Sequence, residues 1–221
     1  PVCILLHDNG GSGSNMIGDW QNYLGDHILI APTGISQDWN IAVESKHPDI
    51  QFLEELIVNL KNYSNVDSTK IRILGVGNGG ALAQRALIEI DDSSVDTFVF
   101  VKTALFDPQF RTNTFYKPSS YLSTGLNDAN YDTVTSPILG RRILTINGIN
   151  DTTIDYNGGI SSDGYNYYPA QDNTFYWAKS QGYNGNVIPD VGGIFYGAFQ
   201  TYYYSYLSGQ VLHYKTGTTH T

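Results

Sequence analysis

The fold of this 221-residue chain is decided by one stretch, Ile71-Arg72-Ile73-Leu74-Gly75-Val76-Gly77-Asn78-Gly79-Gly80. Residues 71–74 favour a strand, and the glycines that follow predict a tight turn. Residues 81–90 are good helix formers. A strand, a glycine-flanked turn and a helix form the setting of a nucleophile elbow, in which a reactive side chain stands on a sharp, strained turn. Here the central position holds Gly77, which has no side chain.

Further elements lie on both sides of this stretch. Short apolar runs at residues 2–6 and 27–31 precede it, and others at residues 95–101 and 142–146 follow it. Such continuous runs are typical of strands that are buried on both faces. Residues 50–63 place apolar side chains at helical spacing. Strands that alternate with helices predict an α/β fold, with a mostly parallel sheet and helices on both faces.

Two polar segments, residues 105–137 and 158–209, lack a clear period. In the second we expect aromatic helices around residues 175–180 and 195–207. Both segments are interpreted as long loop excursions above the sheet, so residues 1–221 are expected to form a single domain. The chain begins at Pro1, inside an apolar run and without an initiator Met. We therefore expect it to be a piece excised from a longer polypeptide.

Charge and composition restrict the class of partner. Twelve Lys and Arg against 21 Asp and Glu give a net charge of −9, which disfavours nucleic-acid binding. No apolar stretch approaches the roughly 20 residues that span a bilayer. The single cysteine, Cys3, excludes an internal disulfide and a Cys-based zinc site, and no metal site is expected. Abundant tyrosine with little charge favours an extracellular, virion-surface or cell-surface location.

The glycine turn also has a second interpretation. Gly75, Gly77 and Gly80 match G-x-G-x-x-G, the fingerprint of a dinucleotide-binding turn. That fingerprint is completed by an acidic residue after the following strand. Asp96 instead stands at the beginning of the next expected strand. The dinucleotide reading is therefore disfavoured, and no cofactor is expected.

Around the turn, the chain resembles the polyhydroxyalkanoate depolymerase and feruloyl esterase group of α/β-hydrolases. Segments similar to motifs of that group follow one another in the same order along nearly the whole chain. They are His7-Asp8-Asn9-Gly10-Gly11 for H-G-x-G-G, Ala31-Pro32-Thr33-Gly34 for A-P-D-G, Asp38-Trp39-Asn40 for S-W-N, Gly77-Asn78-Gly79-Gly80 for S-N-G-G, Asn147-Gly148-Ile149-Asn150-Asp151 for H-G-x-x-D, and Gly217-Thr218-Thr219-His220-Thr221 for G-G-G-H-T. Among the departures are Asp8 for Gly, Gly77 for Ser and Asn147 for His.

The resemblance implies a Ser-Asp-His triad in that chain order. Gly77 then occupies the nucleophile position, Asp151 is the orienting carboxylate and His220 is the base, while the backbone N–H groups of Asn9 and Asn78 are the oxyanion donors. We expect His220 to lie within hydrogen-bond reach of Asp151 and to face Gly77 across a gap the size of a hydroxymethyl group. Two alternatives stay open, because Asp151 also suits a plain turn and His220 lies near the end of the sequence.

Two classes of function follow. The first is an esterase- or depolymerase-like hydrolase domain that is inactive, or nearly so, because Gly77 cannot attack a substrate. The second is a non-catalytic binding or structural module of an extracellular or viral surface assembly. Gly77 is either natural or a designed replacement, and the departures at Asp8 and Asn147 favour natural loss. The expected partners are an ester or polysaccharide-linked ligand, and a protein or second copy that covers the sheet edge at residues 2–6.

Overall fold

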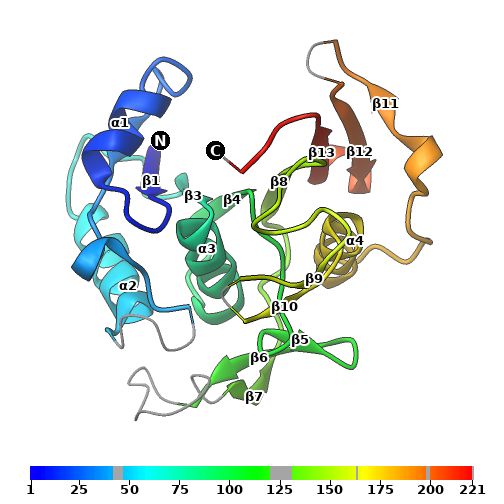
Figure 1. The fold of residues 1–221 in the computed structure, drawn as a ribbon. Coiled ribbons are helices and arrows are strands. Elements are labelled where there is room, and N and C mark those ends of the chain that lie inside the picture. The colour runs from blue at the N-terminus through cyan, green and yellow to red at the C-terminus, as the bar shows by residue number, and fades with distance from the viewer. Residues whose placement is uncertain (42–46, 120–130, 163, 198–199, 221) are drawn as a thin grey trace.

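The computed structural model describes residues 1–221 except 42–46, 120–130, 163, 198–199 and 221. An eight-stranded sheet forms its centre (Figure 1). In spatial order its strands are β11 (Ile194–Phe195), β12 (Tyr202–Tyr206), β13 (Val211–Thr216), β8 (Arg142–Gly148), β4 (Val95–Val101), β3 (Ile71–Val76), β1 (Val2–Leu6) and β2 (Ile28–Ile30). The strands from β2 to β13 are parallel, and β12 and β11 continue the sheet antiparallel. The sheet is therefore mostly parallel, as the sequence predicts.

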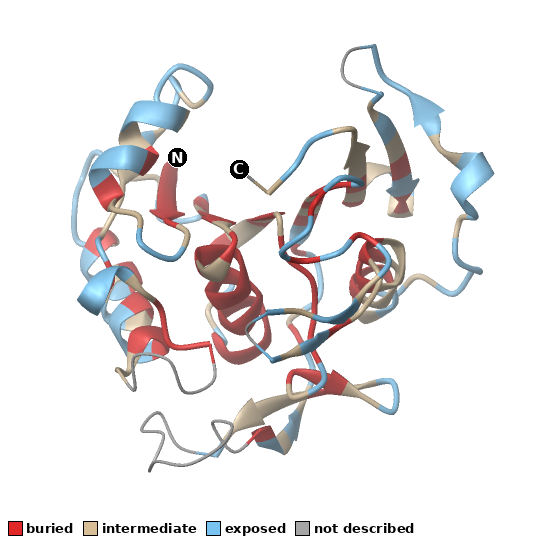
Figure 2. Cartoon of the chain, in the orientation of Figure 1, coloured by how far each residue is buried: buried red, intermediate tan, exposed pale blue. Residues whose placement is uncertain are grey.

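Helices cover both faces of this sheet, because its strands bury alternate residues on opposite sides. The helices are α1 (Gly13–Trp20), α2 (Asp49–Leu60), α3 (Asn78–Glu89) and α4 (Ala170–Ser180). Cys3 and Leu5 of β1 pack with Met16 of α1 on one face. Ile4 and Leu6 belong to the larger core on the other face, which α2, α3 and α4 share. Figure 2 shows α3 buried along almost its whole length.

The first polar segment folds into a small sheet of its own. Its antiparallel strands are β5 (Phe110–Arg111), β6 (Thr114–Pro118) and β7 (Tyr131–Thr135). Phe115 stacks on Trp177 of α4, with ring centroids 4.8 Å apart. A second short pair, β9 (Gly159–Ile160) and β10 (Asn166–Tyr167), lies in the other polar segment. Trp177 also contacts Phe100 of β4, with ring centroids 5.7 Å apart, so aromatic contacts join the two segments to each other and to the main sheet.

The helix expected at residues 195–207 is wrong. This region forms β11 and β12, which extend the main sheet rather than lie above it. From Tyr203 to Tyr206 the more and less buried residues of β12 alternate as in a strand, with Tyr204 and Tyr206 buried. Aromatic residues suit such a half-buried pleated surface. The following strand, β13, was not expected from the sequence.

The N-terminal edge of the sheet also differs from expectation. β1 is not at the edge, because β2 pairs with it on the side away from β3. β2 itself is not buried on both faces, and Ile28 is 37% exposed. An edge strand has a neighbour on one side only, so its side chains are less covered. The edge that a partner would cover is therefore that of β2.

Candidate functional site

Gly77 connects β3 to α3 in a conformation that favours glycine. Its φ is 52° and its ψ is −118°, a backbone conformation that residues other than glycine rarely adopt. The neighbouring glycines are required by close backbone contacts. A Cβ on Gly75 would lie 2.1 Å from the Gly79 oxygen, and one on Gly79 would lie 2.4 Å from the Leu6 oxygen. The turn therefore has the sharp geometry of a nucleophile elbow, with no side chain at its apex.

The loop after β1 is held beside this turn by buried hydrogen bonds. His7 Nε2 accepts from the Gly34 N–H at 2.9 Å, so its Nδ1 carries the proton. Nδ1 donates to the backbone oxygen of Asp8 at 2.7 Å. Trp39 Nε1 donates to the His7 oxygen at 2.9 Å. The Asn78 side chain accepts from the Trp39 N–H at 2.8 Å and donates to its oxygen at 3.1 Å. His7 thus shapes the loop, and Asn78 ties α3 to Trp39.

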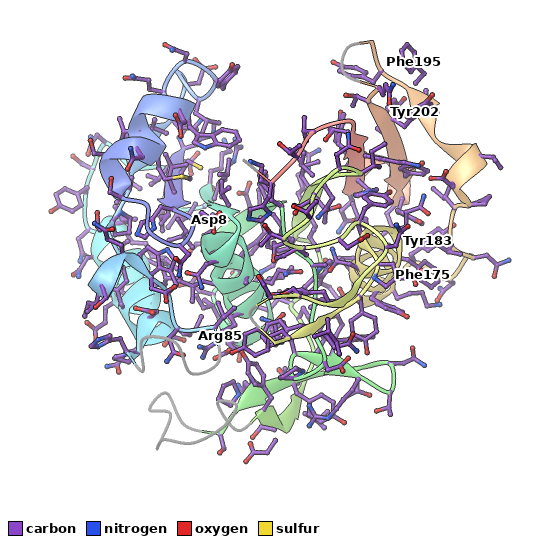
Figure 3. The ribbon with its side chains drawn as sticks, viewed as in Figure 1. Asp8, Arg85, Phe175, Tyr183, Phe195 and Tyr202 are labelled. Atoms are coloured by element: carbon purple, nitrogen blue, oxygen red, sulfur yellow. The ribbon has the colours of Figure 1, made fainter. Side chains whose placement is uncertain are left out.

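Asp8 occupies the centre of the site. Its Oδ1 accepts hydrogen bonds from the N–H groups of Asn9 and Asn78, each at 2.8 Å. These are the two oxyanion donors that the resemblance implies. A Cβ on Gly77 would lie 2.0 Å from the same oxygen. The expected empty gap beside Gly77 is therefore wrong, because the Asp8 carboxylate fills it. Figure 3 labels Asp8 beside α3.

His220 and Asp151 lie together beside Asp8. His220 Nδ1 is 2.7 Å from Asp151 Oδ2, and His220 Nε2 is 3.3 Å from Asp8 Oδ2. The other Asp151 oxygen accepts from the N–H groups of Thr153 and Ile154, both at 2.9 Å. Asp151 therefore both forms a turn and orients the imidazole. All five residues implied by the resemblance, Gly77, Asp151, His220, Asn9 and Asn78, meet at one place.

The segment that carries His220 is anchored although it stands near the end of the sequence. After β13 the chain turns back toward the middle of the sheet (Figure 1). Asn150 Nδ2 donates to the Gly217 oxygen at 2.9 Å, and the Asn150 N–H donates to the Thr218 oxygen at 3.2 Å. Lys102 Nζ donates to the backbone oxygen of His220. These bonds hold the imidazole between the two carboxylates.

The three charged groups shift one another's protonation. The hydrogen bond with Asp8 raises the pKa of His220 more than burial lowers it, and Asp151 raises it further. Burial by itself would raise the pKa of Asp8, but the hydrogen bonds from His220, Asn78 and Asn9 outweigh it and lower that pKa. Both shifts favour the ion pair between His220 and Asp8.

A cavity of ≈ 370 Å³ opens in front of these groups. Asp8 and His220 line it together with Ile41, Ile154 and Tyr167. It thus combines a few charged atoms with apolar walls, as small-molecule sites do. Within the described residues no group of three or more His, Cys, Asp or Glu side chains could hold a metal ion. No helix in the described part of the chain is long and apolar enough to cross a membrane.

From the sequence, Asp8 is expected only to bring a negative charge beside the Asn9 N–H. Its bond from the Asn78 N–H and its position beside Gly77 were not expected. Two separate departures from the family's motifs, taken together, indicate this arrangement. Gly77 leaves a space, and Asp8 brings a side chain that fills it. The third departure, Asn147, is buried and donates to the Thr103 oxygen at 3.0 Å. Asn147 therefore serves packing beside the site.

Comparisons with known proteins relate this architecture to solved structures. No protein-family model matches the chain, and neither does any curated protein sequence. A carboxylesterase from Bacillus cereus has a similar structure, with a TM-score of 0.53 and 13% sequence identity over 82% of this chain and 74% of that one. A poly(3-hydroxybutyrate) depolymerase from Bordetella parapertussis aligns with a TM-score of 0.47 and 14% identity, over 69% of this chain and 56% of its own. With its mostly parallel sheet, covered by helices on both faces, this chain has an α/β-hydrolase-like fold.

Proposed function

We propose that this is an α/β-hydrolase domain that does not hydrolyse carboxylic esters. One observation carries the proposal: Asp8 Oδ1 accepts from both oxyanion donors and lies where the side chain of a serine at position 77 would be. Acyl transfer needs a nucleophile and free donors for the oxygen of the substrate. Both are missing here. The resemblance to depolymerases and feruloyl esterases supports a parent activity of this kind, lost in this chain.

The expected loss is large. Removing one oxyanion donor typically costs about 10²–10³ in rate. In this chain both donors are engaged by an anion, which also repels the negative charge that develops on a substrate carbonyl. The His220 Nε2 that would take a proton from a nucleophile lies 3.3 Å from Asp8 Oδ2 instead. Each of these effects lowers the rate independently of the missing serine.

A second candidate is a non-catalytic binding or structural module of an extracellular or viral surface assembly. The observation that favours it is the closed network of Asp8, His220 and Asp151 beside an intact cavity. A site that has lost catalysis but keeps its charged groups paired still gains stability from those contacts. In this proposal residues 1–221 act as a single domain, its ligand is an ester or polysaccharide-linked molecule, and a protein or second copy covers the edge at β2.

Hydrolysis of p-nitrophenyl butyrate tests the proposal. The native chain and His220→Gln are compared, because the variant removes the imidazole that pairs with Asp151. Circular dichroism verifies that the variant is folded. We expect both to release p-nitrophenol at the rate of buffer with an unrelated protein. Native turnover that disappears in His220→Gln would show that the site still transfers acyl groups.

A further inference from the structure

Asp8 has three properties that are found together in a carboxylate nucleophile. One oxygen is fixed by two N–H groups, the other is 3.3 Å from an imidazole that a second carboxylate orients, and the side chain lines a cavity with 35% of its surface exposed. A nucleophile beside a base that a third group orients is the general signature of covalent catalysis, and Asp is among its nucleophiles. We propose that Asp8 attacks a saturated carbon atom that carries a leaving group, in a small alkyl halide or epoxide.

The Asn9 and Asn78 N–H groups already bind Asp8, and this favours a saturated carbon as the target. An attack on an acyl carbon would need the Asn9 and Asn78 N–H groups for the carbonyl oxygen of the substrate, and Asp8 Oδ1 already holds both. An attack by Oδ2 on an alkyl carbon needs no such donors. It converts Asp8 into an ester whose carbonyl oxygen, Oδ1, already lies in front of the two N–H groups. The two N–H groups can then stabilise the negative charge that develops on Oδ1 when Asp8 Cγ is attacked.

In the first step, an electron pair of Oδ2 forms the new C–O bond. The bond from that carbon to the leaving group breaks, and the leaving group departs with its electron pair. A halide leaves as the anion, whereas the oxygen of an epoxide stays on the adjacent carbon and takes the proton that His220 releases. Because the ester is neutral, His220 loses one of its two anionic neighbours. Its pKa then falls and its proton is released.

In the second step, the neutral His220 takes a proton from water, and the resulting hydroxide attacks Asp8 Cγ. Oδ1 becomes the oxyanion, facing Asn9 and Asn78. The Cγ–Oδ2 bond then breaks, and the leaving alkoxide takes the proton from His220. The products are an alcohol that contains the former Oδ2 and an Asp8 carboxylate that contains the oxygen of water. For a halide the sum is RX plus water giving ROH plus HX, and for an epoxide it is the epoxide plus water giving a 1,2-diol, so atoms and charge balance in both cases.

Isotope labelling tests this sequence. The native chain, Asp8→Asn and His220→Gln are incubated in ¹⁸O-water with 1-bromobutane or 1,2-epoxybutane, and their peptides are analysed by mass spectrometry. We expect the native chain to gain ¹⁸O in the peptide that contains Asp8. In His220→Gln that peptide should keep the alkyl group, because loss of a general base slows ester hydrolysis by about 10²–10⁴-fold. Asp8→Asn should show neither change, and its circular dichroism verifies its fold.

Exposed carboxylates in the same samples are the internal control. Peptides that contain Asp19 and Asp132, both exposed, should remain unlabelled. Labelling of Asp8 by one probe identifies the substrate class as halide or epoxide. The inference is overturned if neither probe labels Asp8, or if Asp19 and Asp132 are labelled equally. That result would leave the absence of ester hydrolysis intact and favour the non-catalytic module, whereas His220-dependent p-nitrophenyl butyrate hydrolysis would overturn the proposed function alone.

Discussion

Gly77→Ser by itself should destabilise the protein, because serine and the Asp8 carboxylate need the same space. The new Cβ would lie 2.0 Å from Asp8 Oδ1 and 2.5 Å from Oδ2, whereas ordinary contacts begin at 3.4 Å. Asp8 must therefore leave, and its two hydrogen bonds from Asn9 and Asn78 break. Bonds to charged groups contribute about 1.5–3 kcal/mol each. Because Asp8 is 35% exposed and water replaces part of this, we expect a loss of about 2–4 kcal/mol.

Asp8→Gly combined with Gly77→Ser should remove the conflict. Glycine at position 8 is the residue of the resembling family, and it frees both oxyanion donors. His220 keeps its 2.7 Å contact with Asp151, so the new hydroxyl has an oriented base. We expect kcat/KM for p-nitrophenyl butyrate in the double variant to exceed that of Gly77→Ser by at least about 10²-fold, the effect of one regained donor.

The assay is a double-mutant cycle over native, both single variants and the double variant. It combines kcat/KM with the free energy of unfolding from urea titrations. We expect Gly77→Ser to destabilise the native background by more than the Asp8→Gly background. Equal destabilisation in the two backgrounds, or equal esterase rates for Gly77→Ser and the double variant, would refute the claim that Asp8 blocks the site.

Three further predictions concern the groups around the site. His220→Gln should lower the free energy of unfolding most between about pH 4 and pH 6.5. The raised pKa of His220 stabilises the fold below the ordinary histidine pKa, and the lowered pKa of Asp8 stabilises it above the ordinary aspartate pKa. Urea titrations across pH measure this, and a difference from native that grows as the pH rises above about 6.5 would contradict the ion pair. Gly79→Ala should destabilise the protein by about 3 kcal/mol or more, because its Cβ would meet the backbone oxygens of Leu6 and His7 at 2.4 Å. The control is Gly18→Ala, whose Cβ would have no atom within 4 Å and which should stabilise α1 by about 0.5–1 kcal/mol. Equal shifts in melting temperature for these two variants would argue against the close approach of β1 to α3. Asn78→Ala should cost about 1 kcal/mol, because the Trp39 oxygen loses its donor while the Trp39 N–H keeps its bond to Asp38 Oδ1. A thermal melt unchanged from native would show that this tie is not needed.

The sequence by itself determined the central architecture. The strand, glycine turn and helix around Gly77, the parallel strands β1, β4 and β8, and the helices α2 and α4 are all readable from local patterns. Those patterns depend on residues a few positions apart, because burial on two faces or on one helical stripe repeats with a short period. The spacing of the family-like motifs also indicated which residues converge, and the structure brings those residues together.

Local patterns were insufficient where neighbours in space set the outcome. Residues 202–206 contain enough tyrosine for either an aromatic helix face or a strand, and pairing with β13 decides for the strand. Residues 27–31 are as apolar as a central strand, yet β2 lies at the edge because only β1 pairs with it in the described sheet. Aromatic and apolar residues fit both settings, so tertiary packing overrides their preference.

The tertiary structure alone decided what occupies the site. Asp8 and Asn78 are 70 positions apart, and His220 and Asp151 are 69 apart, yet the ends of β1, β3, β8 and β13 bring them together. From the sequence, Gly77 indicates only a missing side chain and Asp8 only a charge near a donor. A partly buried carboxylate needs polar partners, and those of Asp8 beside Gly77 are two N–H groups and the His220 imidazole. Which side chain fills that volume depends on distances in space, and those follow from the packing of the whole sheet.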